Sequence, residues 1–209
     1  MPFLNMDHGP WVAGGCARLL AENVGKLGFS DIDVFFPNEE LMKWAKQYLQ
    51  SRKMATFDGF VLTGDNETPA SHQFIFYAKD DVGTGTEGQK YVIQLVKKKY
   101  YESNADLLAD FDFTICMFVT DGHDLIGDDR ALMDVKNRRL VLINNPPKPK
   151  AARLAKYCAH GFIPTEGVLT AMFGVDTDRF CTQDLKQDEY DGWARCSMFL
   201  HLHWLIHET

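Results

Sequence analysis

Two aspartates separated by one residue, Asp31 and Asp33, are the side chains of this sequence best suited to hold a divalent cation. They lie in the run Ser-Asp-Ile-Asp-Val-Phe-Phe, which predicts a β-strand over residues 31–36. Alternate residues of a strand point to the same face, so both carboxylates would share one face while Ile32 and Val34 enter a core. Two neighbouring anions repel each other unless a cation lies between them. The pair therefore predicts a site for Mg²⁺, or for Mn²⁺, hard ions that take carboxylate and phosphate oxygens.

A pair of glycines, Gly14 and Gly15, precedes the acidic strand by one helix-length segment in the run Gly-Gly-Cys-Ala-Arg. Backbone N–H groups without side chains around them can approach a polyphosphate at the start of a helix, and a helix is expected from Cys16 to Asn23. This order of glycines, helix and paired aspartates favours a site for a nucleotide and its metal ion. The alternative for the aspartates is a surface pair that ends a strand.

Five residues, Gly14, Gly15, Arg18, Asp31 and Asp33, resemble the head domain of polymerase-β-like nucleotidyltransferases, in particular CCA-adding enzymes and bacterial poly(A) polymerases. Their opening motif reads Gly-Gly-x-x-Arg followed by a paired-Asp strand. The resemblance implies two-metal transfer of a nucleoside monophosphate from an NTP, ATP first among them, to a hydroxyl, with release of pyrophosphate. It also implies an α+β fold, a nucleotidyltransferase-like mixed sheet flanked by helices. The residues from Pro164 on leave little room for the large helical body of that family, so we expect a small, mainly helical C-terminal portion.

A second motif begins at Asp112, after a short helix that Ser103 or Asn104 can cap. Alternating aromatic and polar residues predict a strand over residues 111–116. The run Asp-Phe-Thr-Ile resembles the Arg-Arg-Asp-Phe-Thr-Ile-Asn motif of CCA-adding enzymes. The resemblance implies that Asp112 is the third metal carboxylate, on a neighbouring strand, and helps to activate the attacking hydroxyl. The alternative is that Asp112 only begins a strand.

A later helix, expected from about residue 149 to His160, resembles the family's Glu-Asp-x-x-Arg-x-x-Arg helix, which reads the incoming base in CCA-adding enzymes. Arg153 matches its first arginine and Lys156 stands for the second, while Pro149-Lys150 replaces the acidic pair. For these two cations a solvated helix face is an equal alternative. The residues expected to bind the nucleotide are Gly14, Gly15, Arg18, Ser30, Arg153 and Lys156.

Further elements are expected from local composition. Aromatic and β-branched residues predict strands over residues 57–63, 71–78 and 91–96, and Asn38 is a candidate N-cap for the helix after the acidic strand. The Gly-containing loop 80–88 is expected to connect strands rather than hold phosphate, because no helix follows it. We expect a catalytic domain over residues 1–145 and a helical extension over residues 146–209 that packs on it.

The composition limits the classes of protein to consider. With 209 residues, 45% of them hydrophobic, the chain can bury a core, and its net charge of −7 disfavours binding to long duplex nucleic acid. No apolar run approaches the roughly 18–20 residues that span a bilayer, and the N-terminus lacks the features of a secretory signal. A cytoplasmic location is expected, whether in a cell or in an infected host.

Scattered cysteines and C-terminal histidines do not predict a further metal site. Five cysteines without a Cys-x-x-C pair indicate free thiols in a reducing compartment. His201, His203 and His207 share no single face in either a helix or a strand, so exposed or packing roles are favoured.

Three functions remain consistent with these patterns. The first is an NTP-dependent nucleotidyltransferase whose acceptor is an RNA end, a protein or a small molecule. The second is a non-catalytic nucleotide-binding protein of the same fold that acts as a regulator or an inhibitor. The third is an unrelated α/β interaction protein. The first is favoured because a protein that only binds nucleotides has no need of all three acids.

Overall fold

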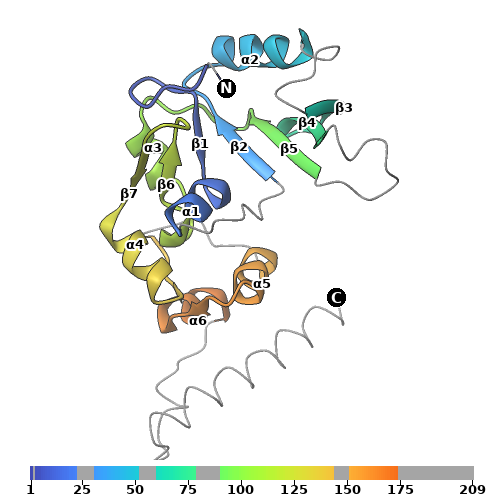
Figure 1. Ribbon diagram of the computed structural model, residues 1–209. Helices are drawn as coiled ribbons and strands as arrows, with labels where there is room; N and C mark the ends of the chain where they lie inside the picture. Colours follow the sequence, from blue (N-terminus) through green and yellow to red (C-terminus); the bar gives the residue numbers. More distant parts are fainter. Residues whose placement is uncertain (2, 23–30, 52–59, 79–89, 144–150, 174–209) are drawn as a thin grey trace, which may run out of the picture.

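A seven-stranded mixed sheet forms the centre of the molecule (Figure 1). The computed structural model describes residues 1, 3–22, 31–51, 60–78, 90–143 and 151–173 of the 209. The strand order is β3-β4-β5-β2-β1-β6-β7, and all neighbours are antiparallel except β2 and β5, which run parallel. The strands are β1 Trp11–Ala13, β2 Asp31–Phe35, β3 Phe60–Glu67, β4 Ser71–Ala78, β5 Lys90–Val96, β6 Phe118–Thr120 and β7 Leu125–Gly127. The acidic pair therefore lies on a central strand, as expected for an α+β fold.

Helices cover both faces of this sheet, and the buried residues form two hydrophobic clusters. They are α1 Gly15–Ala21, α2 Glu39–Ser51, α3 Asn104–Ala109, α4 Asp129–Lys136, α5 Ala151–Ala159 and α6 Glu166–Phe173, with a 3₁₀ turn, η3, at Thr114–Cys116. One cluster joins the apolar side of α2 to Val34, Phe74 and Leu95 of the sheet. The other joins α3, α4, α5 and α6 to Trp11 and Val119. A separate two-stranded parallel sheet pairs β8, Arg139–Leu140, with β9, Ile163–Pro164.

Local signals in the sequence set several element boundaries. The side chain of Asn38 accepts a hydrogen bond from the N–H of Leu41 at 2.9 Å, and Ser103 accepts one from the N–H of Asp106 at 3.1 Å. Both are N-cap interactions that satisfy a free N–H at the start of a helix, which confirms the predicted starts of α2 and α3.

The predicted strands are confirmed, with differences at some of their ends. β4 has the predicted bounds, and β5 begins one residue early at Lys90. β3 continues past Thr63 to Glu67 through a bulge between Leu62 and Gly64, which local composition did not indicate. The predicted residues 57–59 and the loop 80–88 lie outside the described residues.

The predicted strand over residues 111–116 is wrong. Thr114, Ile115 and Cys116 form η3 and are all buried, so alternation between a buried and an exposed face ends at Phe113. The Thr114 hydroxyl donates to buried Asp134 of α4 at 2.7 Å, which holds this turn inward. The strand that joins the sheet here is β6, beginning at Phe118. Asp112 thus lies before the turn and outside the seven-stranded sheet.

The helical portion after residue 145 shares a core with the rest of the chain. Leu154, Tyr157 and Cys158 of α5 and Val168 of α6 belong to the cluster that contains Trp11. The division into domains at residue 145 stays an expectation, because residues 144–150 and 174–209 lie outside the described part. Within that part no helix is long and apolar enough to cross a membrane. Cys16, Cys116 and Cys158 are buried free thiols, as expected, and the three C-terminal histidines lie outside the description.

Candidate functional site

The acidic pair occupies one face of β2, as its spacing predicted. Ile32 and Val34 pack into the cluster under α2, so Asp31 and Asp33 point to the opposite face. Burial, and then the neighbouring carboxylate of Asp31, raise the pKa of Asp33 to about 6. The nearby positive charges of Lys156 and Arg153 act in the opposite direction without cancelling that effect. The protein therefore holds two carboxylates together with too little positive charge to neutralise them.

The donor set at this position suits a divalent cation. Two carboxylates on adjacent same-face positions supply hard oxygen ligands, and burial together with the charge of Asp31 disfavours the ionised form of Asp33 and raises its pKa. A bound cation would offset that effect. Among the described residues no group of three or more His, Cys, Asp or Glu side chains is placed to hold a metal ion.

The Gly-Gly turn lies beside Asp33. Gly14 has a φ of +76°, a conformation that residues with a side chain rarely adopt, and its N–H donates to the carbonyl of Phe118 at 3.2 Å. A Cβ added to Gly15 would meet no atom within 4 Å, so space is open above this residue. Burial, together with the negative charge of Asp33, raises the pKa of the Cys16 thiol to about 12. The first turn of α1 therefore lies near the acidic strand.

Arg18 is engaged within the protein. It is 4% exposed, it forms an ion pair with Glu22 one helical turn later, and Glu22 also pairs with Arg138 at 3.3 Å. The guanidinium groups of Arg18 and Arg138 lie 5.1 and 5.2 Å from the centre of the Phe162 ring. This arrangement ties α1 to the segments that follow α4 and α5. The Nε atom of Arg18 is buried and has no hydrogen-bond partner in the described structure.

Asp112 is held by Arg153 in a two-point ion pair. Arg153 Nε lies 2.7 Å from Asp112 Oδ2, and Arg153 Nη2 lies 2.8 Å from Asp112 Oδ1. The same guanidinium lies 3.4 Å from the hydroxyl of Tyr157, which contacts the thiol of Cys116 at 2.9 Å. Both expected site residues are therefore brought together, but they neutralise each other and fasten α5 to the segment before η3.

The strands beside β2 carry no carboxylate at the register of the pair. On β5, Gln94 pairs with Asp33 and Val92 pairs with Asp31. On the other side β1 contributes only Trp11, Val12 and Ala13. The residue opposite Asp33 on the neighbouring strand β5 is thus an amide. Sequence reasoning missed Gln94 because its relation to Asp33 depends on which strands pair.

Two of the residues predicted to bind the nucleotide, Lys156 and Ser30, remain to be placed. Lys156 on α5 is close enough to Asp33 for its charge to act on that carboxylate. Ser30 lies outside the described residues. Glu22, which holds Arg18, was also missed, although its position four residues after Arg18 on a helix indicates an ion pair.

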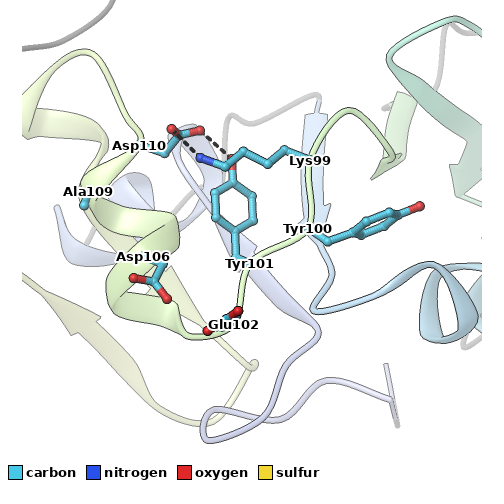
Figure 2. Close-up of a pocket in the computed structure, with 7 residues that line it drawn as sticks. All are labelled: Lys99, Tyr100, Tyr101, Glu102, Asp106, Ala109 and Asp110. Atoms are coloured by element: carbon cyan, nitrogen blue, oxygen red, sulfur yellow. Dashed lines mark hydrogen bonds and ion pairs between the residues drawn. The ribbon is translucent and has the colours of Figure 1, made fainter.

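A shallow hollow of about 440 Å³ lies elsewhere in the molecule (Figure 2). It is lined by Lys99, Tyr100, Tyr101, Glu102, Asp106, Ala109 and Asp110. Asp110 there accepts hydrogen bonds from Lys99 and from Tyr101, both at 2.7 Å. The hollow follows the carboxyl end of β5, whereas Asp31 begins the parallel strand β2, so the two lie at opposite ends of these strands. It is not part of the acidic site.

Solved structures that are remotely similar to this chain include a CCA-adding enzyme and a tRNA-processing enzyme. The crystal structure of the Bacillus stearothermophilus CCA-adding enzyme in complex with CTP has a TM-score of 0.43 and 13% identity, over 78% of this chain and 38% of that chain. A tRNA-processing enzyme (apo form 2) has a TM-score of 0.44 and 15% identity, over 77% of this chain and 43% of that chain. The chain thus spans about two fifths of the length of these proteins.

The comparison with protein families matches residues 3–138 of this sequence. No curated protein matches the chain significantly. Residues 3–138, which include the Gly-Gly turn, the acidic pair and Asp112, match the family described as Gad2, Gabija anti-defense 2 family protein. That match extends over more than half of the sequence, and this chain belongs to the Gad2 family.

Proposed function

We propose that this member of the Gad2 family is a metal-dependent nucleotidyltransferase that moves a nucleoside monophosphate from an NTP, ATP first among them, to a hydroxyl acceptor. The observation that carries the proposal is the acidic pair Asp31 and Asp33 on one face of β2, with cationic Lys156 and Arg153 acting on it from α5. A metal-bound triphosphate requires carboxylates that bind the metal ion and positive side chains that bind the phosphate oxygens.

The chain's own residues would bind and orient the reactants. Asp31 and Asp33 would hold Mg²⁺ or Mn²⁺, which when bound supplies charge neutralisation at the phosphates and lowers the pKa of the acceptor hydroxyl. The open space above Gly15 lets a phosphate approach the backbone, and Lys156 supplies positive charge near the leaving pyrophosphate. Arg153 is kept in place by Asp112, so we assign Asp112 a positioning role rather than that of the third metal ligand.

The proposed reaction is a single group transfer. The acceptor hydroxyl oxygen forms a bond to the α-phosphorus, and the bond from that phosphorus to the oxygen that bridges to the β-phosphorus breaks. Pyrophosphate leaves with that bridging oxygen, and the hydroxyl proton is released to solvent.

A second candidate function is nucleotide binding without transfer. It is favoured by two observations: Asp112 is already paired with Arg153, and the residue opposite Asp33 on β5 is the amide Gln94. A protein of this kind would sequester a nucleotide and need no acceptor.

The two functions are separated by one experiment. The protein is incubated with each α-³²P-labelled NTP, Mg²⁺ or Mn²⁺, and bacterial RNA and protein, and nucleotide binding is measured in parallel by calorimetry. Transfer is expected to be lost in Asp31→Asn/Asp33→Asn and kept in Asp7→Asn/Asp124→Asn, a variant that removes the same charge elsewhere. Metal-dependent binding without any transfer would support the second function, and transfer at full rate by the first variant would refute the assignment of the site.

The family's description adds a biological setting to this chemistry. We propose that the transfer acts against the Gabija defence, either on a component of it or on a molecule that it needs. The acidic pair is then the part of the protein on which anti-defence depends.

A further inference from the structure

A row of amide side chains crosses three strands and ends at Asp33. Asn66 of β3 pairs with Gln73 of β4, Gln73 pairs with Gln94 of β5, and Gln94 pairs with Asp33 of β2. Residues paired directly across strands point to the same face of a sheet. Asn66, Gln73 and Gln94, here called the amide row, therefore lie on the face that carries the acidic pair.

Hydrogen bonds within the sheet orient the inner part of this row. Gln73 donates from Nε2 to Oε1 of Gln94 at 3.2 Å, and the Ser71 hydroxyl donates to the same oxygen at 3.4 Å. With that oxygen engaged, the N–H groups of the Gln94 amide are left as donors beside the register position of Asp33. Gln73 and Gln94 are partly exposed and Asn66 is exposed, so a bound molecule can reach all three.

The amide row and α5 differ in charge. The cations that act on Asp33, Lys156 and Arg153, come from α5. β3, β4 and β5 together carry one Lys or Arg, namely Lys90, which stands four residues before Gln94. Ile75 and Val92 form the next row on the same face and are apolar. The phosphates of an NTP therefore belong on the α5 side, and the molecule on the amide side meets hydrogen-bonding and apolar groups.

We infer that the amide row is the acceptor-binding subsite and that the acceptor is a hydroxyl group of a polypeptide rather than of an RNA. This inference rests on the nucleotidyl transfer proposed above. An extended polypeptide offers N–H and C=O groups that amides can pair with, and apolar side chains that fit against Ile75, which is partly exposed. An RNA would bring a phosphate for each nucleotide to three strands that carry a single Lys or Arg, on a protein with a net charge of −7. The product is a phosphodiester between the polypeptide oxygen and the α-phosphorus, and pyrophosphate leaves.

The test uses the full chain with labelled ATP and Mg²⁺, and an extract of bacteria that carry a Gabija system as the source of acceptors. After the reaction, one half of each sample is treated with protease and the other half with ribonuclease. We expect label in material that protease digests and ribonuclease leaves intact. Label that ribonuclease removes would overturn this inference while leaving nucleotidyl transfer in place. Absence of any label with the wild-type chain would instead refute the proposed transfer, and this inference with it.

Variants of the amide row test its part in acceptor binding. Gln73→Leu/Gln94→Leu should lower labelling of protein about tenfold or more, because two net hydrogen bonds are lost, while the Kd for ATP stays unchanged. Gln50→Leu removes an amide on the α2 side of the same sheet, where Gln50 bonds Asp65, and should label at the wild-type rate. If the first double variant does not fold, Asn66→Ala/Gln73→Ala is used in its place. Full labelling by an amide-row variant with intact ATP binding would overturn the inference.

Discussion

Asp33 combines burial, a like-charged neighbour and a position on a central strand, and its charge is therefore linked to the stability of the fold. Its pKa is raised from 3.8 to about 6 in the folded protein. Between these values the folded chain keeps a proton that the unfolded chain releases, so the contribution of Asp33 to stability falls as pH rises from about 4 to about 6. Above pH 6 the folded state carries the full cost of two adjacent charges.

Replacing this carboxyl by an amide should therefore stabilise the protein in metal-free buffer. We expect Asp33→Asn to raise the free energy of unfolding at pH 7.5 by about 1–2 kcal/mol, and to give no gain at pH 4. Urea denaturation in EDTA at both pH values measures this, with Asp7→Asn as the control. An equal change in the free energy of unfolding at pH 4 and pH 7.5 would contradict the raised pKa of Asp33. Excess Mg²⁺ should stabilise the wild type and leave the variant unchanged.

The two glycines of the turn should respond differently to alanine. Gly14→Ala places a side chain at a φ of +76° and should cost about 1 kcal/mol or more. Gly15→Ala adds a methyl group to open space at the first position of α1 and should change stability by less than about 0.5 kcal/mol. If a phosphate approaches this backbone, Gly15→Ala will nevertheless weaken ATP binding. Thermal denaturation and calorimetry on the two variants check both statements, and equal losses of stability would refute them.

At the scale of elements, the ion pair between Asp112 and Arg153 connects α5 to the segment before η3. A double-mutant cycle with Asp112→Asn and Arg153→Met should give a coupling of about 1 kcal/mol, modest because 44% of the Arg153 side chain is exposed. In the same variants, Asp112→Asn should leave the affinity for Mg²⁺ unchanged. Loss of Mg²⁺ binding would instead make Asp112 a metal ligand.

Elements whose signals are local could be predicted from the sequence. Features that depend on contacts between distant residues could not. The strand with Asp31 and Asp33 and the caps Asn38 and Ser103 follow from spacing and residue type alone. The predicted strand at 111–116 failed because burial of Thr114 depends on Asp134, twenty residues later. The position of Gln94 opposite Asp33 required knowledge that β2 pairs with β5 across about 60 residues of chain.

At the scale of the whole molecule, the proposed function depends on the acidic pair and predicts a phenotype. Bacteria that carry Gabija and produce the wild-type chain should lose protection against a virus that Gabija normally restricts. Asp31→Asn/Asp33→Asn should restore protection in full if transfer is required, whereas Asp7→Asn/Asp124→Asn should behave as the wild type. Plaque counts together with measured protein levels provide the readout. If the acidic-pair variant still abolished protection by Gabija, the anti-defence activity would depend on another part of the protein.

The parallel pairing of β2 with β5 also determines when the acidic face is assembled during folding. The antiparallel pair β3–β4 is close in sequence and can form early, whereas β2 and β5 must close a long loop before they meet. Until then Asp33 remains hydrated, and its repulsion with Asp31 is weak. We expect the strain of the site to enter after the rate-limiting step, in which case Asp33→Asn will slow unfolding and leave the folding rate almost unchanged. The same repulsion that would attract a cation thus limits the lifetime of the metal-free native state.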